Sequence, residues 1–108
     1  MKDLHGCNCK ADSWSAILDK MPPEKPRLAV KGICTCPTGG FKASLVKATP
    51  QGINPKILLL RLVADPPPGA TNQVETDFPV TYHESNAPDY ETVEILPCNL
   101  AVPVKAVS

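Results

Sequence analysis

The chain has 108 residues, a length that corresponds to a single domain. Its 11 basic and 11 acidic side chains give a formal net charge of zero, so it lacks the positive charge with which proteins hold nucleic acid or an anionic membrane. Thirteen prolines argue against a helical bundle, because a proline inside a helix costs about 3 kcal/mol.

Residues 1–12 are polar and are predicted to form a flexible tail. They contain no apolar stretch of the kind that a signal peptide needs, and the rest of the chain has no run of about 20 apolar residues that would span a membrane. Leu4-His5-Gly6-Cys7 resembles the lipidation box of bacterial lipoproteins, but the hydrophobic stretch before such a box is missing. We therefore expect a soluble cytoplasmic protein with mostly reduced thiols, or a lipid-anchored or exported one if the true start lies upstream.

Residues 13–26 are predicted to form a short helix followed by a proline-rich linker. Trp14, Ile17, Leu18 and Met21 recur at helical spacing, so they would form one apolar face. A helix of about nine residues is not stable alone. We expect it to cover one end of the core or, alternatively, to bind a partner.

Residues 27–108 change to period-two alternation and are predicted to form the β domain. A turn at Pro37-Thr38-Gly39-Gly40 separates two alternating runs, so a hairpin is predicted in which Cys36 faces Phe41 and Cys34 faces Ala43. The face that both runs share is expected to be buried: Val30, Cys34, Cys36, Phe41, Ala43 and Leu45.

Three further segments are predicted to be strands. Residues 57–64 are almost entirely apolar, which is typical of a central strand. Residues 74–82 alternate, and Pro79 within them indicates a strand at a sheet edge or a bulge. Residues 90–106 are predicted to form a second hairpin around Cys98-Asn99, with Ile95 facing Val102 and Val93 facing Val104.

Six to seven short strands with proline-rich and glycine-rich turns suggest an antiparallel sandwich or a small barrel. The strand pattern resembles that of immunoglobulin-like and fibronectin-like sandwiches, although the antibody-type Cys…Trp…Cys signature is absent because Trp14 precedes the first predicted strand. We expect an all-β antiparallel β-sandwich with one short N-terminal helix.

Charge is unevenly distributed along the chain. Between Leu62 and Val104 there are seven acidic residues and no Lys or Arg, whereas residues 1–54 carry an excess of basic groups. These charges are expected to lie on solvated strand faces, which also oppose aggregation between sheet edges. Alternatively, they form a charged docking surface.

Five cysteines offer soft ligands or redox chemistry. Cys34 and Cys36 lie on the same side of their predicted strand, where they would serve as core residues, pair one thiol with Cys98, or bind a metal. His5, Cys7 and Cys9 form a polar cluster that could hold zinc or Cu(I) if a further sulfur completes it. Cys98, at a predicted hairpin turn, is the expected exposed and reactive thiol.

We find no catalytic motif, so no catalytic or cofactor-binding residue is predicted. The sequence favours a non-catalytic interaction module that binds a protein partner or a second copy through a sheet edge or through loops 50–56, 65–72 and 83–89. One alternative is a thiolate protein that binds Zn or Cu or responds to redox state through its five cysteines: Cys7, Cys9, Cys34, Cys36 and Cys98. Another alternative is a small enzyme in which His83 acts as a base.

Overall fold

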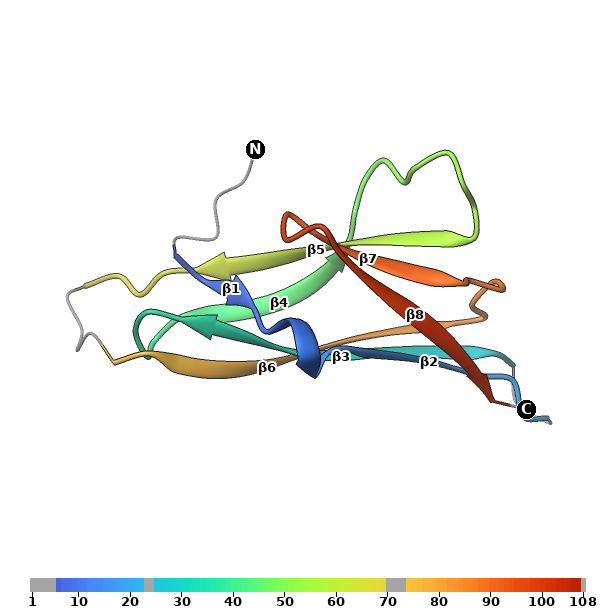
Figure 1. Cartoon of the computed structure of the whole chain (residues 1–108), viewed down its shortest axis with the longest axis horizontal. Coiled ribbons are helices and arrows are strands. Elements are labelled where there is room, and N and C mark those ends of the chain that lie inside the picture. Colours follow the sequence, from blue (N-terminus) through green and yellow to red (C-terminus); the bar gives the residue numbers. More distant parts are fainter. Residues whose placement is uncertain (1–5, 23–24, 70–73, 108) are drawn as a thin grey trace.

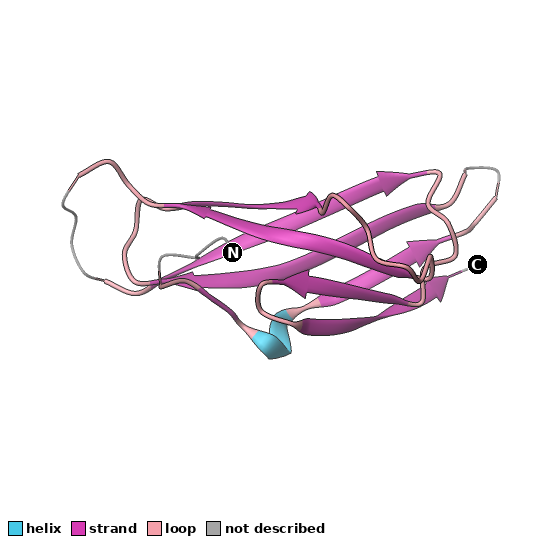
Figure 2. Ribbon diagram, turned by 90° about the horizontal axis from the view of Figure 1, so that it is seen from above, coloured by secondary structure: helices cyan, strands magenta, loops and turns pink. Residues whose placement is uncertain are grey.

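The computed structural model describes residues 6–22, 25–69 and 74–107. These residues form an elongated molecule of 49 × 27 × 22 Å in which a single 3-10 turn, Ala11–Ser13, is the one helical element (Figure 2). The strands, in chain order, are β1 (Asn8–Cys9), β2 (Ser15–Asp19), β3 (Arg27–Cys36), β4 (Lys42–Lys47), β5 (Ile57–Asp65), β6 (Thr76–Ser85), β7 (Thr92–Leu96) and β8 (Leu100–Val107). Among the described residues, no helix has the length and apolar character that crossing a bilayer requires.

The strands belong to one mixed sheet that is strongly curled into a half-barrel (Figure 1). Seven of them follow the order β1-β3-β2-β8-β7-β5-β4, and β6 pairs with β3. The pairs β2–β8 and β5–β7 are parallel, whereas the other pairs are antiparallel. Strand β8 joins the two halves, because its first residues pair with β7 and its last residues pair with β2.

The predicted antiparallel β-sandwich, and with it the immunoglobulin-like or fibronectin-like architecture, is therefore wrong. Two stacked sheets would need a break in the hydrogen-bonded ladder, but the ladder continues through β8. A twisted strand of this length can pair with different neighbours at its two ends. The single sheet then curls around its own apolar face instead of packing against a second sheet.

The predicted N-terminal helix is also wrong, because residues 15–19 form strand β2. Ala16 and Leu18 point into the core, whereas Ile17 is 44% exposed. Strands β3 and β8 pair with β2 on its two sides, so they satisfy backbone groups that a short isolated helix would leave exposed to water. The segments expected to be a flexible tail and a short helix thus contribute β1 and β2 to the sheet.

The first predicted hairpin has the correct buried face but the wrong neighbour. Strand β3 pairs with β6, with Cys34 opposite Phe78, and β4 pairs with β5. Even so, Cys34, Cys36 and Phe41 are buried as expected. Alternation determines which side of a strand is apolar, but it does not determine which strand lies beside it.

The second predicted hairpin is shifted by two residues. Ile95 lies opposite Leu100, and Val93 lies opposite Val102. The turn spans residues 97–99, with Asn99 in the left-handed region at φ 55°. A shift of two residues leaves every side chain on its predicted face, because the side-chain period of a strand is also two.

The concave side of the sheet holds the core. Trp14 lies across Gly32 so closely that a Cβ atom on Gly32 would be 2.1 Å from the indole ring. The outer strands β4 and β6 approach each other across the open side of the curl, where Lys47 Nζ lies 3.7 Å from Glu84 Oε1. The largest fully buried side chains come from four strands, β2, β3, β5 and β7: Leu18, Leu28, Val30, Cys34, Cys36, Leu58, Leu60, Leu62, Val93 and Ile95.

Candidate functional site

A shallow groove lies on the convex face of the sheet over β2, β3 and β6. It is formed by outward-facing side chains, because alternate residues of each strand point away from the core. Its lining residues are Ser15, Ile17, Asp19, Arg27, Ala29, Lys31 and His83. We refer to these residues, together with the adjacent Lys105, as the cationic groove.

The cationic groove has an apolar centre and a basic rim. Ile17 lies directly between Ala29 on β3 and Lys105 on β8 in the strand register. Within the described parts of the chain, Arg27, Lys31 and Lys105 form no ion pair. The single acidic group is Asp19, whose Oδ1 accepts a hydrogen bond of 3.0 Å from the backbone N–H of Met21. The rim therefore carries a local excess of positive charge.

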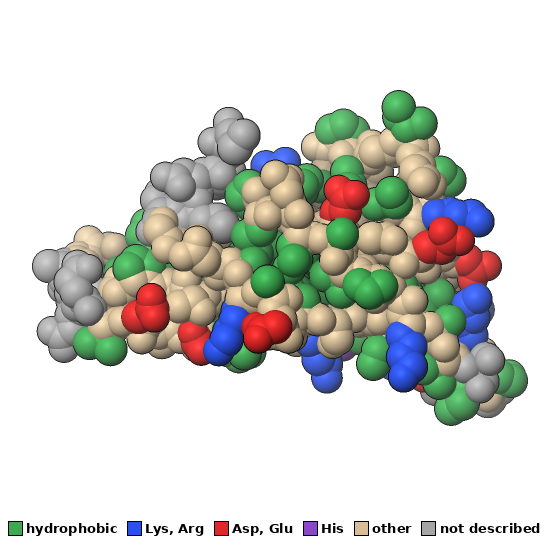
Figure 3. Space-filling view, viewed as in Figure 1, with side chains coloured by type: hydrophobic (Ala, Val, Ile, Leu, Met, Phe, Trp, Pro, Cys, Tyr) green, Lys and Arg blue, Asp and Glu red, His purple; other side chains and the backbone are tan. Residues whose placement is uncertain are grey.

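Elsewhere, lysine side chains form ion pairs with acidic side chains of the C-terminal half. Neighbouring basic and acidic groups are visible on the face shown in Figure 3. The hydrogen bond from Lys20 to Asp89 is the shortest of these contacts, at 2.6 Å, and it lowers the pKa of the Asp89 carboxyl. The charge asymmetry seen in the sequence is thus partly neutralised by ion pairs at the molecular surface. The four pairs are Lys10–Asp77, Lys20–Asp89, Lys47–Glu84 and Lys56–Glu91.

His83 lies in this groove, but the structure does not place it in a proton relay. Ser15 and Asp19 lie on β2, and β3 separates β2 from His83 on β6. The backbones of β2 and β6 are thus two strand spacings, about 9.6 Å, apart. No described hydrogen bond joins His83 to either side chain, so these residues do not form the Ser-His-Asp arrangement of a hydrolase.

Of the three loops predicted to bind a partner, loop 50–56 is held most firmly. The Gln51 side chain donates to the carbonyl oxygens of Ala48 and Leu59 at 2.7 and 2.9 Å, and its oxygen accepts from Leu59 N–H at 2.9 Å. Ile53 at its tip is fully exposed, and the loop projects above the sheet in Figure 1.

The other two predicted loops, 65–72 and 83–89, are only partly seen as loops in the structure. Residues 70–72 of loop 65–72 lie outside the described residues. The first three residues of loop 83–89 belong to a strand instead, because β6 continues to Ser85. The remainder turns at Asn86, whose φ is 56°, and the N–H of Ala87 then donates to the carbonyl oxygen of Pro26 at 3.1 Å.

The five sulfur atoms gather at one end of the sheet. Disulfides join Cys7 to Cys36 and Cys9 to Cys98. Cys34 is the free cysteine; it is fully buried, and burial raises the pKa of its thiol. Cys98, predicted to be the reactive thiol, is bonded to Cys9 in the structure.

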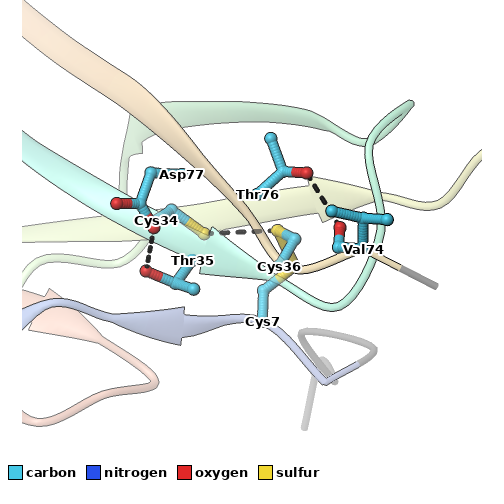
Figure 4. Close-up of a disulfide and its surroundings, with 7 residues drawn as sticks. All are labelled: Cys7, Cys34, Thr35, Cys36, Val74, Thr76 and Asp77. Atoms are coloured by element: carbon cyan, nitrogen blue, oxygen red, sulfur yellow. Dashed lines mark hydrogen bonds between the residues drawn. A yellow bond between two sulfur atoms is a disulfide. The ribbon is translucent and has the colours of Figure 1, made fainter.

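The Cys34 Sγ lies 3.7 Å from the Cys36 Sγ, as Figure 4 shows. Strand β1 brings Cys7 to this point, because Asn8 pairs with Thr35 in the register. The sulfurs of Cys7, Cys34 and Cys36 all lie within 4.8 Å of one another. The proposed N-terminal metal ligand His5 lies outside the described residues.

A partly buried network of two phenols around one carboxylate was not predicted from the sequence. The hydroxyls of Tyr82 and Tyr90 donate to the two oxygens of Glu84 at 2.7 and 2.8 Å. Burial, followed by these hydrogen bonds, raises the pKa of Tyr90 to about 12 and that of Tyr82 still further. The i, i+2 spacing of Tyr82 and Glu84 was an available signal, since such residues share one face of a strand.

We find no match to this chain among protein-family models, curated proteins or solved structures. Its function is therefore inferred from its own residues.

Proposed function

We propose that the protein is a non-catalytic interaction module that binds an acidic, extended segment of a partner protein in the cationic groove. The main supporting observation is that three cations, which pair with no acidic group among the described residues, surround the half-exposed Ile17 on one face of the sheet. A rigid sheet presents these groups without the entropy cost of ordering a loop.

Charge and shape determine the kind of partner that fits. Arg27 and Lys31 lie on β3, and Lys105 lies on β8, with β2 and Ile17 between them. An extended peptide that lies over these three strands can therefore reach cations on both sides of Ile17. Carboxylates of the peptide would pair with these cations, and an apolar residue between them would cover Ile17. Nucleic acid is a poorer fit, because the chain as a whole carries no net positive charge.

The two disulfides favour an oxidising compartment for this activity. Disulfides persist in extracellular and periplasmic spaces and are rare in the reducing cytosol. We therefore propose an exported location in place of the cytoplasmic one expected from the sequence. The disulfides also attach β1 to the sheet and so fix the position of the chain that leads into β2.

The test is binding of a fluorescein-labelled peptide of alternating Glu and Val, measured by fluorescence anisotropy. The double variant Arg27→Glu/Lys31→Glu should bind about tenfold more weakly than the wild type, which corresponds to about 1.4 kcal/mol. Added salt should weaken wild-type binding, since exposed charges are screened.

The matched control is Lys25→Glu/Lys42→Glu, which makes the same change in net charge at two exposed lysines outside the groove. It should leave the affinity unchanged. The proposal fails if the control loses as much affinity as the groove variant, if the wild type does not bind the peptide, or if a DNA duplex binds equally well.

A further inference from the structure

We propose that Cys7, Cys34 and Cys36 form a three-sulfur site for one Cu(I) ion when the Cys7–Cys36 disulfide is reduced. The site is independent of the cationic groove. It consists of three buried cysteines, Cys34 and Cys36 on β3 and Cys7 immediately before β1, and only one of them, Cys34, is free in the oxidised protein.

The distances between the three sulfurs suit coordination of one metal ion. An ion held by three sulfurs at about 2.3 Å in a plane keeps them about 4 Å apart. Cys34 Sγ and Cys36 Sγ are already 3.7 Å apart, and no pair in the cluster is separated by more than 4.8 Å. Once the disulfide is broken, van der Waals contact between the sulfurs of Cys7 and Cys36 requires a similar separation. The strands therefore hold the three ligands close to the required geometry.

The same triangle argues against transfer of the disulfide to Cys34. A thiolate attacks a disulfide in line, so the attacking and leaving sulfurs would lie on opposite sides of the central one. Here the central sulfur would be that of Cys36, and the leaving sulfur that of Cys7. With Cys34 Sγ 3.7 Å from Cys36 Sγ, an in-line arrangement would place the sulfurs of Cys34 and Cys7 about 5.8 Å apart. The observed cluster is more compact than that, so it favours chelation over exchange.

The ligand set selects the metal. Soft thiolates favour Cu(I), whereas structural zinc sites are four-coordinate. No histidine or carboxylate among the described residues joins the cluster. Cys9 lies on the same face of the strand pair, but its sulfur is outside the triangle and is bonded to Cys98. Three sulfurs without a fourth donor therefore match Cu(I) better than Zn²⁺.

Before Cu(I) can bind, an external dithiol must reduce the Cys7–Cys36 disulfide. The dithiol gives two electrons and two protons to the Cys7–Cys36 bond, which becomes two thiols, while the dithiol is oxidised to its own disulfide. Cu(I) then enters without a change in its oxidation state and displaces protons from the cysteine sulfurs. Cys7 lies between exposed Gly6 and Asn8, so the site is close to the surface through which the ion would enter.

The experiment is an anaerobic titration of the fully reduced chain with Cu(I) against a chromogenic Cu(I) chelator. The wild type should bind one ion per chain, and Cys34→Ala should weaken binding by at least ~100-fold, because even a lost second-shell partner costs 10–100-fold. Cys34 is not in a disulfide, so Cys34→Ala also leaves both disulfides of the oxidised protein available to confirm folding.

The matched control is Cys9→Ser/Cys98→Ser, which removes two sulfurs outside the triangle and should retain wild-type affinity. In the reduced state neither this variant nor the wild type contains a disulfide, so the two can be compared directly. Equal loss of affinity in the control, or wild-type affinity in Cys34→Ala, would show scattered thiolate binding and overturn the proposal. Cys34-dependent loading of Zn²⁺ would overturn the choice of metal.

Discussion

At the scale of single residues, Glu84 shows how the curl of the sheet creates a polar site that no sequence motif predicts. Its carboxylate lies on β6, close to the β4 edge, where it receives two phenol hydroxyls and faces Lys47. Tyr82 comes from the same strand, but Tyr90 comes from the segment before β7. Burial and the neighbouring negative charge both disfavour the phenolate, so the folded chain holds these protons tightly.

The network predicts how stability depends on alkaline pH. The pKa of Tyr90 is about 12 in the folded chain, above its ordinary value of 10.0, so its contribution to stability is complete below pH 10 and is lost as the pH rises towards 12. Tyr82 acts in the same direction. The chain has only two tyrosines, so phenolate absorbance reports this pair alone.

Glu84→Gln should lower both tyrosine pKa values by removing the negative charge, while burial keeps them above 10. A wild-type phenolate titration centred at the ordinary value of 10.0 would contradict the network. Urea unfolding at pH 9 and pH 11 measures the accompanying change in stability.

At the scale of elements, strand β2 depends on a glycine of its neighbour. Trp14 immediately precedes β2 and covers Gly32 on β3, so the indole occupies the space that a Cβ atom on Gly32 would need. The apolar residues Trp14, Leu18 and Ile17 fit both a helical and a strand period in part. Only the close approach of β3 decides in favour of the strand.

Gly32→Ala should therefore destabilise the protein by about 3 kcal/mol or more, at the upper end of the cost of overpacking a core. Thermal unfolding should show a large fall in Tm. Trp14 is the only tryptophan, so a red shift of its emission should report its displacement. The control is Gly39→Ala, where the added Cβ meets Thr76 Oγ1 at an ordinary 3.6 Å. Equal stability of the two variants would exclude a close Trp14–Gly32 contact.

At the scale of the whole molecule, two disulfides connect distant parts of one sheet. Cys7–Cys36 spans 29 residues, and Cys9–Cys98 spans 89. The second disulfide joins β1 to the turn between β7 and β8, and thus links the two halves that strand β8 also connects. Ordering of the N-terminal strand is thereby tied to folding of the C-terminal hairpin.

Loop-closure entropy predicts about 3.6 kcal/mol of stabilisation from the shorter loop and about 4.6 kcal/mol from the longer one. Reduction should lower the free energy of unfolding by several kcal/mol, a large part of the 5–15 kcal/mol typical of a domain. Urea titrations of oxidised and reduced protein measure this difference.

Before reduction, thiol labelling should detect one cysteine per chain, Cys34, and only after unfolding. Labelling of native Cys98 would contradict the Cys9–Cys98 disulfide. Superimposable urea curves for the two redox states would show that the disulfides do not constrain the unfolded chain.

The alternation of apolar residues by itself determined that the chain is all β from residue 27 onward, and which faces of β3, β4, β7 and β8 are buried. It placed Cys34 and Cys36 in the interior correctly, because side-chain direction in a strand is a local property with a period of two. It could not determine that β3 pairs with β6, or that β8 joins both halves, because strand partners are chosen by contacts between distant segments.

The candidate sites were decided by the same long-range pairing. Register along β1 sets Cys7 beside Cys36, and the parallel pairing of β2 with β8 adds Lys105 to the cations of β3. Each residue type was visible in the sequence, but its neighbours were not. Only the tertiary structure could bring them together, because the curl of the sheet sets which strands become adjacent.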